Sequence, residues 1–184
     1  MLRPPRVEDV DALLALSNEH EQEIGRFSKV EFEELMAMSF RTRTTEARDA
    51  FLLSLAEKAP AVAPNYSWFA RRFDRFVYVD RVVVATGARK RGLGRLLYRD
   101  LIGAAASAGF RRLCCEVNID PPNPASDAFH AALGFREIGR AYLPDRRKTV
   151  RYLVFEFDDG FARSASTPTT SNRSDLPASR RMRR

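Results

Sequence analysis

Hydrophobic and polar residues alternate along the chain with two different periods, which predict strands and helices in mixed order. A period of two with β-branched and aromatic residues is clearest in F-V-Y-V-D-R-V-V-V, residues 76–84. Apolar residues recur at helical spacing after the glycines at 92 and 94, and Gly109 ends that pattern. The expected strands are 2–6, 50–55, 76–84, 112–118, 135–142 and 149–157, and the expected helices are 7–19, 28–38, 93–108 and 123–134.

Turn and capping residues place the boundaries of these elements. Two prolines restrict the first strand to an edge of the sheet. Ser28 followed by Glu31 predicts a capping box, and Asn123 followed by proline predicts another helix start. Residues 58–69, K-A-P-A-V-A-P-N-Y-S-W-F, are expected to form a loop. The order of elements predicts an α/β fold, a mixed sheet with helices on its faces.

Composition adds a few limits. The chain has 184 residues, 45% hydrophobic and 30% charged, as expected for one globular domain. It has neither an apolar run of about 18 residues nor an apolar N-terminal segment, so we expect a cytoplasmic protein without a membrane partner. Cys114 and Cys115 are neighbours on a strand and point to opposite faces, which argues against a disulfide. With His20 and His130 they lack the spacing of metal ligands, so no metal is expected.

The net charge of +7 is concentrated at the C-terminal end. From Phe161 onward, six arginines face one aspartate in a Ser/Thr/Pro-rich segment with few apolar residues. We therefore expect residues 1–159 to fold as the domain and residues 160–184 to form a disordered basic tail. Nucleic-acid binding through this tail is an alternative that we do not expect to be the main function.

The stretch R-K-R-G-L-G-R-L-L-Y-R-D, residues 89–100, combines cations and glycines at a helix start. Unpaired N–H groups and the helix dipole make such a start an anion site. A Walker A loop is excluded because Leu93 and Gly94 stand where lysine and a hydroxyl residue belong. A Rossmann fingerprint is excluded because Leu97 replaces its third glycine.

The remaining pattern, [Q/R]-x-x-G-x-[G/A], is matched by Arg89, Gly92 and Gly94 and follows the strand V-V-V-A-T. After the next strand, R-L-C-C-E-V-N, the chain reads N-P-A-S-D-A-F-H-A-A-L-G-F over residues 123–135. Together these pieces resemble the GCN5-related N-acetyltransferase (GNAT) superfamily. The resemblance implies a mixed, mostly antiparallel twisted sheet with helices on both faces, in which the fourth and fifth strands splay apart.

The resemblance also implies acetyl-CoA as co-substrate. The N–H groups of residues 90–95 are expected to hold the pyrophosphate, helped by nearby cations. The backbone of residues 82–84 is expected to pair with the pantetheine amides, and Asn123 to contact the same arm unless it is a plain N-cap. The expected cofactor-binding residues are Val82, Val83, Val84, Arg89, Lys90, Arg91, Gly92, Leu93, Gly94, Arg95 and Asn123.

Family chemistry is direct attack of an amine on the thioester, which requires a base for the ammonium proton. Asp80 interrupts an apolar strand and is the preferred base; the alternative is an ion pair with Arg71, Arg72 or Arg81. Glu116 on the next strand is the second candidate. Tyr78 shares the face of Asp80 and either lines the acceptor pocket or packs in the core.

His130 stands where many members of the family have an acid tyrosine, and is expected to donate or relay a proton to the departing thiolate. The alternatives are a structural histidine, with Tyr98, Tyr142 or water as the acid. A covalent mechanism through Cys114 or Cys115 is not expected, because neither has an obvious histidine partner.

The sequence thus predicts an acetyl-CoA-dependent N-acetyltransferase for a primary amine, either a small molecule or a protein amine. Glu19, Glu21 and Glu23 favour a cationic acceptor if they line its site. The main alternative is a non-catalytic CoA-binding or sensing module of the same fold. A homodimer is left open.

Overall fold

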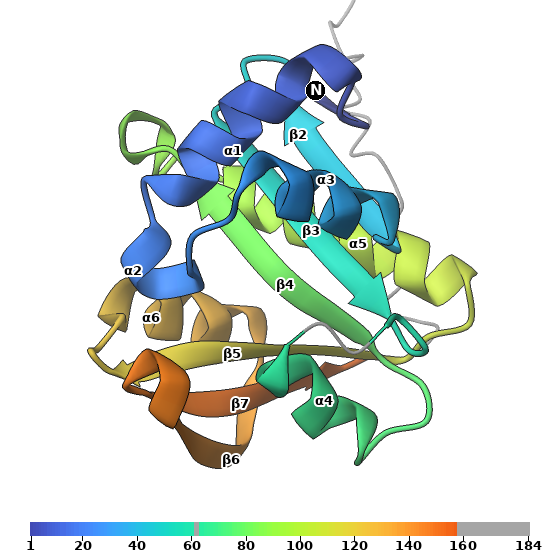
Figure 1. Cartoon of the computed structure of the whole chain (residues 1–184). Coiled ribbons are helices and arrows are strands. Elements are labelled where there is room, and N and C mark those ends of the chain that lie inside the picture. The colour runs from blue at the N-terminus through green and yellow to red at the C-terminus, as the bar shows by residue number, and fades with distance from the viewer. Residues whose placement is uncertain (61–62, 158–184) are drawn as a thin grey trace, which may run out of the picture.

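The computed structural model describes residues 1–60 and 63–157, so the expected tail lies outside the described residues. Within them the strands form one seven-stranded sheet in the order β1-β2-β3-β4-β5-β7-β6 (Figure 1). All neighbouring strands are antiparallel except β4 and β5. The strands are β1 Leu2–Arg3, β2 Arg41–Thr45, β3 Ala50–Ala56, β4 Val77–Val84, β5 Arg112–Asp120, β6 Arg136–Leu143 and β7 Lys148–Glu156.

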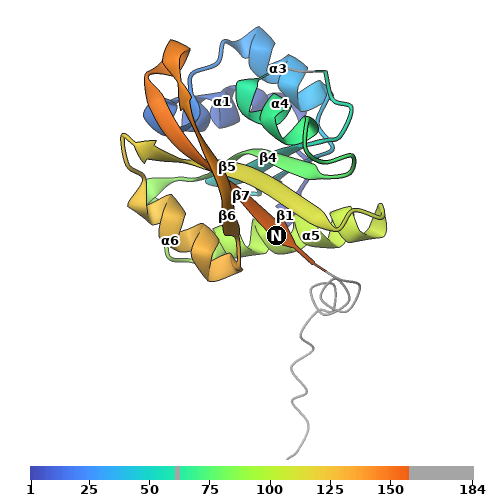
Figure 2. The same cartoon turned by 90° about the horizontal axis from the view of Figure 1, so that it is seen from below.

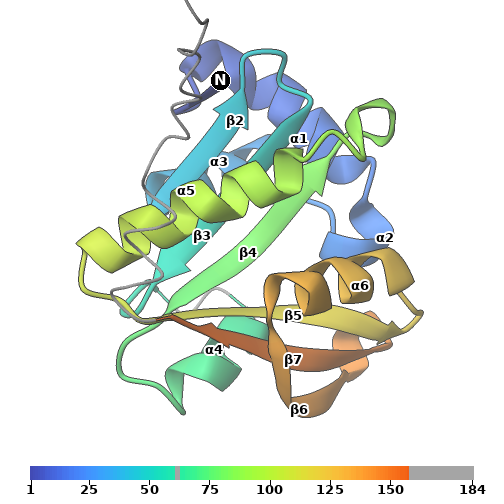
Figure 3. The same ribbon diagram turned by 180° about the vertical axis from the view of Figure 1, so that it is seen from behind.

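Helices cover both faces of this sheet, as Figure 2 shows from below. Four lie on one face: α1 Val10–Asn18, α2 Glu21–Ile24, α3 Lys29–Ala37 and α4 Pro64–Ala70. Two lie on the other face, α5 Leu93–Ser107 and α6 Pro124–Leu133 (Figure 3). Residues 1–60 and 63–157 also contain three short 3-10 turns, η1 Val7–Asp9, η2 Thr86–Ala88 and η3 Pro144–Arg146. The expected GNAT-type architecture is confirmed.

β4 and β5 pair only at their beginnings, Val77 with Leu113 and Tyr78 with Cys114. Beyond these pairs the two strands diverge, and Figures 1 and 3 show β4 and β5 leading away from each other. The expected splay is therefore present. It leaves one edge of β4 without a paired strand over the residues that precede the glycine loop.

β4 contains a bulge at Asp80. Ser54 of β3 pairs with Val79 and Leu53 pairs with Arg81, so Asp80 has no partner on β3. Such an extra residue places two consecutive side chains on the same face of the sheet. Asp80 and Arg81 therefore both point toward the face covered by α1 to α4.

Two expectations about local structure were wrong. Residues 64–69, the second half of the expected loop, lie in the helix α4, because proline occupies its first turn and Tyr66 and Phe69 are buried. The sequence R-T-R-T-T, for which no strand was expected, forms β2 because its threonines face inward: Thr42, Thr44 and Thr45 are buried. The expected capping box is confirmed, since Glu31 N–H donates to Ser28 Oγ and Ser28 N–H donates to Glu31 Oε2.

Candidate active site

Glu116 lies on β5 just beyond the point where β4 and β5 separate. Its carboxylate accepts two hydrogen bonds: Asn65 Nδ2 donates to Oε1 at 2.7 Å, and the Tyr78 hydroxyl donates to Oε2 at 2.8 Å. Burial raises the pKa of Glu116 to about 7, and the charge of Asp80 acts in the same direction. The two hydrogen bonds act in the opposite direction. A carboxyl with this pKa exchanges its proton near neutral pH, as a general base must.

Asn65 connects Glu116 to a stack of aromatic residues. Its Oδ1 accepts from the Tyr152 hydroxyl at 3.1 Å. The Tyr152 ring stacks on Trp68 with centroids 4.0 Å apart. The Arg72 guanidinium lies over the Trp68 ring, with its carbon 3.6 Å from the ring centroid. A Cβ on Gly139 of β6 would come within 2.7 Å of Trp68, so the missing side chain makes room for the indole. This stack anchors α4 to β6 and β7, and α4 carries Asn65 to the carboxylate.

Asp80, on β4, lies close enough to Glu116 for its charge to act on that carboxyl. It is nearly buried, with 9% of its side chain exposed. Arg81 Nε donates to Asp80 Oδ2 at 2.8 Å, so of the three arginines considered as partners, Arg81 forms the ion pair. Arg81 is itself held by Ser17 Oγ at 2.7 Å and by the ring of Phe27 at 4.1 Å. Asp80 is therefore an oriented anion beside Glu116, with one oxygen already engaged.

The glycine loop ends at Gly92, which caps α5 with a left-handed φ of +79°. The first helical hydrogen bond runs from Leu96 N–H to the Gly92 carbonyl, so the N–H groups of residues 93–95 have no helical acceptor. Nothing lies within 4 Å of a Cβ at Gly92, whose surroundings are open to a ligand. Arg89, Lys90, Arg91 and Arg95 are exposed around this turn. The loop therefore has the geometry and charge of a phosphate site.

Gly94 has a packing role that the sequence did not indicate, in addition to its expected place in the phosphate loop. A Cβ there would come within 2.9 Å of the ring of Phe129 on α6, so this glycine allows α5 to pack against α6. Arg91 already forms an ion pair within the protein, because its Nη1 lies 3.1 Å from Asp49 Oδ2.

The expected pantetheine contacts lie along the splay. Val82 and Val84 pair with Leu52 and Ala50 of β3, and the opposite edge of β4 faces the gap. Asn123 caps α6, its Oδ1 accepting from Ser126 N–H at 3.1 Å. That bond leaves the side-chain amide nitrogen of Asn123 for a ligand.

Comparison with known proteins identifies the family of this chain. Residues 39–135 match the family described as "Acetyltransferase (GNAT) family", which is more than half of the chain. The chain belongs to the GNAT family. In a separate comparison, the chain is 38% identical over 109 residues to phosphinothricin N-acetyltransferase of Streptomyces coelicolor, covering 59% of this chain and 57% of that protein. The chain thus spans little more than half the length of this relative.

Solved structures agree with the fold of this GNAT domain. Naa20 of Chaetomium thermophilum, in complex with a bisubstrate analogue, is 20% identical with a TM-score of 0.69, covering 85% of this chain and 86% of Naa20. NAA60 of Arabidopsis thaliana, in complex with acetyl-CoA, is 14% identical with a TM-score of 0.66, covering 85% of this chain and 99% of NAA60.

His130, where many GNAT proteins have tyrosine, lies in the core and is only 3% exposed. Its Nδ1 lies 2.8 Å from the Ser126 carbonyl oxygen, which can only accept, so Nδ1 carries the proton. Its Nε2 then accepts from the Tyr98 hydroxyl at 2.8 Å. Burial lowers the pKa of His130, which keeps the ring neutral. The geometry favours a structural role for His130 over the expected proton donor.

Replacing His130 by phenylalanine is expected to destabilise this GNAT domain by about 1–3 kcal/mol, because Tyr98 would keep a buried hydroxyl without its acceptor. Urea unfolding measures the loss. The double variant His130→Phe/Tyr98→Phe removes both partners and should recover part of the stability. In assays of acetyl transfer the pH profile should keep its shape, whereas a large loss of turnover in a folded His130→Phe protein would restore the role of proton donor.

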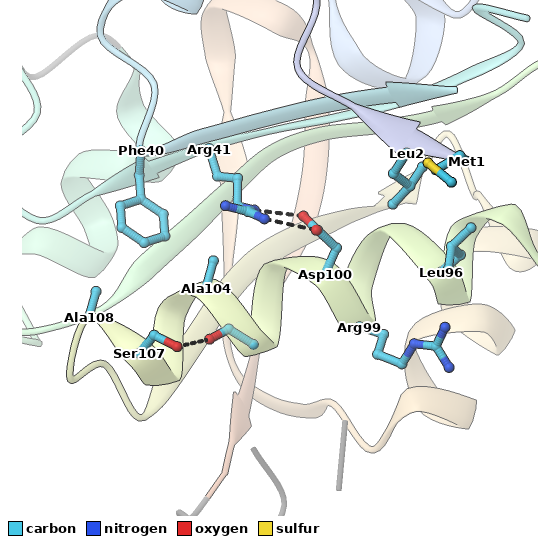
Figure 4. Close-up of a pocket in the computed structure, with 11 residues that line it drawn as sticks. Met1, Leu2, Phe40, Arg41, Leu96, Arg99, Asp100, Ala104, Ser107 and Ala108 are labelled. Atoms are coloured by element: carbon cyan, nitrogen blue, oxygen red, sulfur yellow. Dashed lines mark hydrogen bonds and ion pairs between the residues drawn. The ribbon is translucent and has the colours of Figure 1, made fainter. Parts of the chain in front are cut away.

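A groove with a volume of about 890 Å³ runs along α5, on the side of the helix that faces the beginnings of β1 and β2 (Figure 4). Arg41 and Asp100 form a two-bonded ion pair along it, at 2.6 and 2.8 Å. The lining contains no residue of the candidate site. Because its central charges neutralise each other, we assign it no part in the chemistry.

Other kinds of site find no support in the described residues. Burial raises the pKa of the free thiols Cys114 and Cys115, so neither is an activated nucleophile. Within the described ranges, no three His, Cys, Asp or Glu side chains are grouped as metal ligands would be. In the same part of the chain, no helix is long and apolar enough to cross a membrane.

Proposed function

We propose that this chain is an acetyl-CoA-dependent N-acetyltransferase in which Glu116 takes the proton of a primary amine. The observation that carries the proposal is the position of Glu116: its carboxylate is held by Asn65 and Tyr78 beside the splay of β4 and β5. Burial there raises its pKa to about 7. Family membership and the open glycine turn at the start of α5 support acetyl-CoA as the donor. The folded unit that we propose ends near residue 159.

Binding of the donor follows from the residues of the loop and the splay. The N–H groups of residues 93–95 and the cations around them would hold the pyrophosphate. The free edge of β4 near Val82 would pair with the pantetheine arm. A β4 N–H near Val82 would also donate to the oxyanion that forms on the attacked carbonyl carbon.

In the reaction, the amine nitrogen forms a bond to the acetyl carbon and the carbon–sulfur bond breaks, with its electron pair leaving on sulfur. Glu116 accepts the amine proton, directly or through water. We propose water as the proton source for the thiolate. The Tyr98 hydroxyl is buried and already donates to His130, and Tyr142 is 62% exposed on β6.

Acceptors would approach Glu116 from the face covered by α1 to α4. On this side α2 is fixed by the Asn118 amide, which donates to the Glu23 carbonyl at 3.1 Å, and by Lys148, which donates to the Gln22 carbonyl. Glu21 pairs with Arg26 at 3.0 Å, which weakens the expected preference for cationic acceptors. We propose a primary amine as the acceptor class, and the amine named in the Streptomyces relative is the first to test.

The full chain with acetyl-CoA is expected to release free thiol only when a suitable amine is present. A panel of phosphinothricin, amino acids, peptides with free N-termini, lysine side chains and polyamines covers the amine classes. With the active amine, kcat/KM should rise with pH through about 7, as Glu116 loses its proton. CoA binding without turnover on any amine would instead support the non-catalytic module.

A further inference from the structure

We propose that Asn65 is a positioning residue of this acetyltransferase, one that orients the Glu116 carboxylate and holds it in its ionised form. The inference rests on the proposed function, in which Glu116 is the base. Asn65 lies on α4, the helix that the sequence had not predicted. Among the described residues, Asn65 forms no side-chain hydrogen bond to the glycine loop or to the splayed edge of β4.

The hydrogen-bond partners of Asn65 fix the orientation of its side-chain amide when Glu116 is ionised. Nδ2 can only donate and lies 2.7 Å from Glu116 Oε1, while Oδ1 accepts from the Tyr152 hydroxyl at 3.1 Å. Asn65 is 4% exposed, so water cannot readily replace either bond. Glu116 Oε2 accepts from the Tyr78 hydroxyl at 2.8 Å. One amide therefore fixes the rotation of the carboxylate from the α4 side, and a tyrosine fixes it from β4.

The surrounding aromatic stack explains why Asn65 keeps this geometry. Trp68, one helical turn after Asn65, lies between Tyr152 and the Arg72 guanidinium. The indole fits because Gly139 has no side chain. A purely packing role would not require an amide at position 65, whereas aligning a carboxylate with a tyrosine hydroxyl requires one donor and one acceptor on the same group.

Several titratable groups face Glu116 and must be considered in any titration of its carboxyl. Asp80 of β4 raises the pKa of Glu116, and Tyr78 stays neutral because burial raises its own pKa. From β7, Lys148 lies close enough for its charge to interact with Glu116, and Tyr152 is neutral for the same reason as Tyr78. Asn65 carries no charge itself. Its hydrogen bond lowers the pKa of Glu116, so removing that bond should raise the pKa of Glu116.

Asn65→Ala is expected to move the acid limb of kcat/KM to higher pH by about one unit, because a hydrogen bond to the ionised carboxylate is lost. Turnover should fall about 10-fold at pH 6.5 and recover to within about threefold at pH 9. Asn65→Asp keeps the size of the side chain but places a second carboxyl beside Glu116. It should move the limb at least as far, since two adjacent carboxylates resist ionising together.

Ser67→Ala is the matched control, because it changes α4 where the described residues show no side-chain hydrogen bond. It should leave the limb in place. If Asn65 only packs, Asn65→Ala will leave the acid limb where it is in wild type, or will lower turnover equally at every pH. Either outcome overturns the proposal.

A titration of the Glu116 carboxyl carbon by ¹³C NMR, assigned with Glu116→Gln, separates this inference from the proposed function. The carboxyl should titrate at a higher pH in Asn65→Ala than in wild type, whether or not an acceptor amine is known. If no amine is acetylated by the wild type, the proposed function fails. An unshifted carboxyl in Asn65→Ala contradicts the role of Asn65 alone.

Discussion

Glu116→Gln is expected to lower kcat/KM by about 10²–10⁴-fold at pH 8, the range for removing a general acid–base group. Glutamine fills the same space and still accepts from Asn65, but it cannot take a proton from the acceptor amine. Affinity for CoA, measured by calorimetry, should stay the same, because the carboxylate lies on β5 and the glycine loop precedes α5. Equal turnover of variant and wild type would remove Glu116 from the mechanism.

The same variant should be no less stable than wild type at pH 8. The folded state raises the pKa of Glu116 from 4.5 to about 7, so the folded protein binds the proton more tightly than the unfolded chain. That difference lowers the free energy of unfolding as the pH rises from 4.5 to about 7, and the loss is complete above it. Glutamine avoids this loss, which is on the order of 3 kcal/mol for a shift of this size. Thermal unfolding at pH 5 and pH 8 measures the difference.

Asp80→Asn is the contrasting variant, because sequence reasoning preferred Asp80 as the base. Without the Asp80 charge the pKa of Glu116 should fall, and the acid limb of kcat/KM should move to lower pH. Turnover at pH 8 should stay within about threefold of wild type if Glu116 is the base. A loss as large as that in Glu116→Gln at all pH values would return the role of base to Asp80.

Gly92→Val is expected to weaken CoA binding by about tenfold or more, equivalent to about 1.4 kcal/mol. The obstacle is conformation and not space. No atom lies within 4 Å of a Cβ at Gly92, but its φ of +79° is strained for a β-branched residue. Relaxing that strain turns the N–H groups of the first turn of α5 away from a bound phosphate. The dissociation constant for CoA should rise, while turnover at saturating acetyl-CoA should change much less.

Gly87→Ala provides the control in the same loop. A Cβ at Gly87 also meets nothing within 4 Å, and its φ lies outside the left-handed range. It should therefore bind CoA like wild type. If Gly92→Val binds CoA normally, the start of α5 is not the phosphate site, and the groove between α5 and the β1–β2 edge becomes the next candidate.

Local sequence signals predicted the parts of the fold that depend on local chemistry. The glycine turn, the capping box at Ser28 and the run of β-branched residues in β4 each act within a few residues of themselves. The seven residues of α4 are different, because a helix so short is stable only through its packing. Trp68 on Tyr152 provides that packing, and the contact joins residues far apart in the chain.

The candidate site shows the same limit. Glu116 and Asp80 could be identified as carboxylates on expected strands, but their different environments could not. The partner of Asp80 depends on a bulge that turns the Arg81 side chain to the same face, and an alternating pattern contains no sign of it. Asn65 could not be connected to Glu116 before α4 was known.

The bulge in β4 makes Asp80 a residue that the strand could lose without inverting its neighbours. With Asp80 deleted, Val79 and Arg81 would become consecutive and would still point to opposite faces, as their β3 partners Ser54 and Leu53 do. Every other side chain of β4 would keep its side of the sheet. Such a position can be gained or lost in a lineage without a change in strand pairing, provided that the buried Arg81, the ion-pair partner of Asp80, is replaced as well. GNAT proteins that differ by one residue in this strand would then differ in the charge beside their base and retain the architecture that holds it.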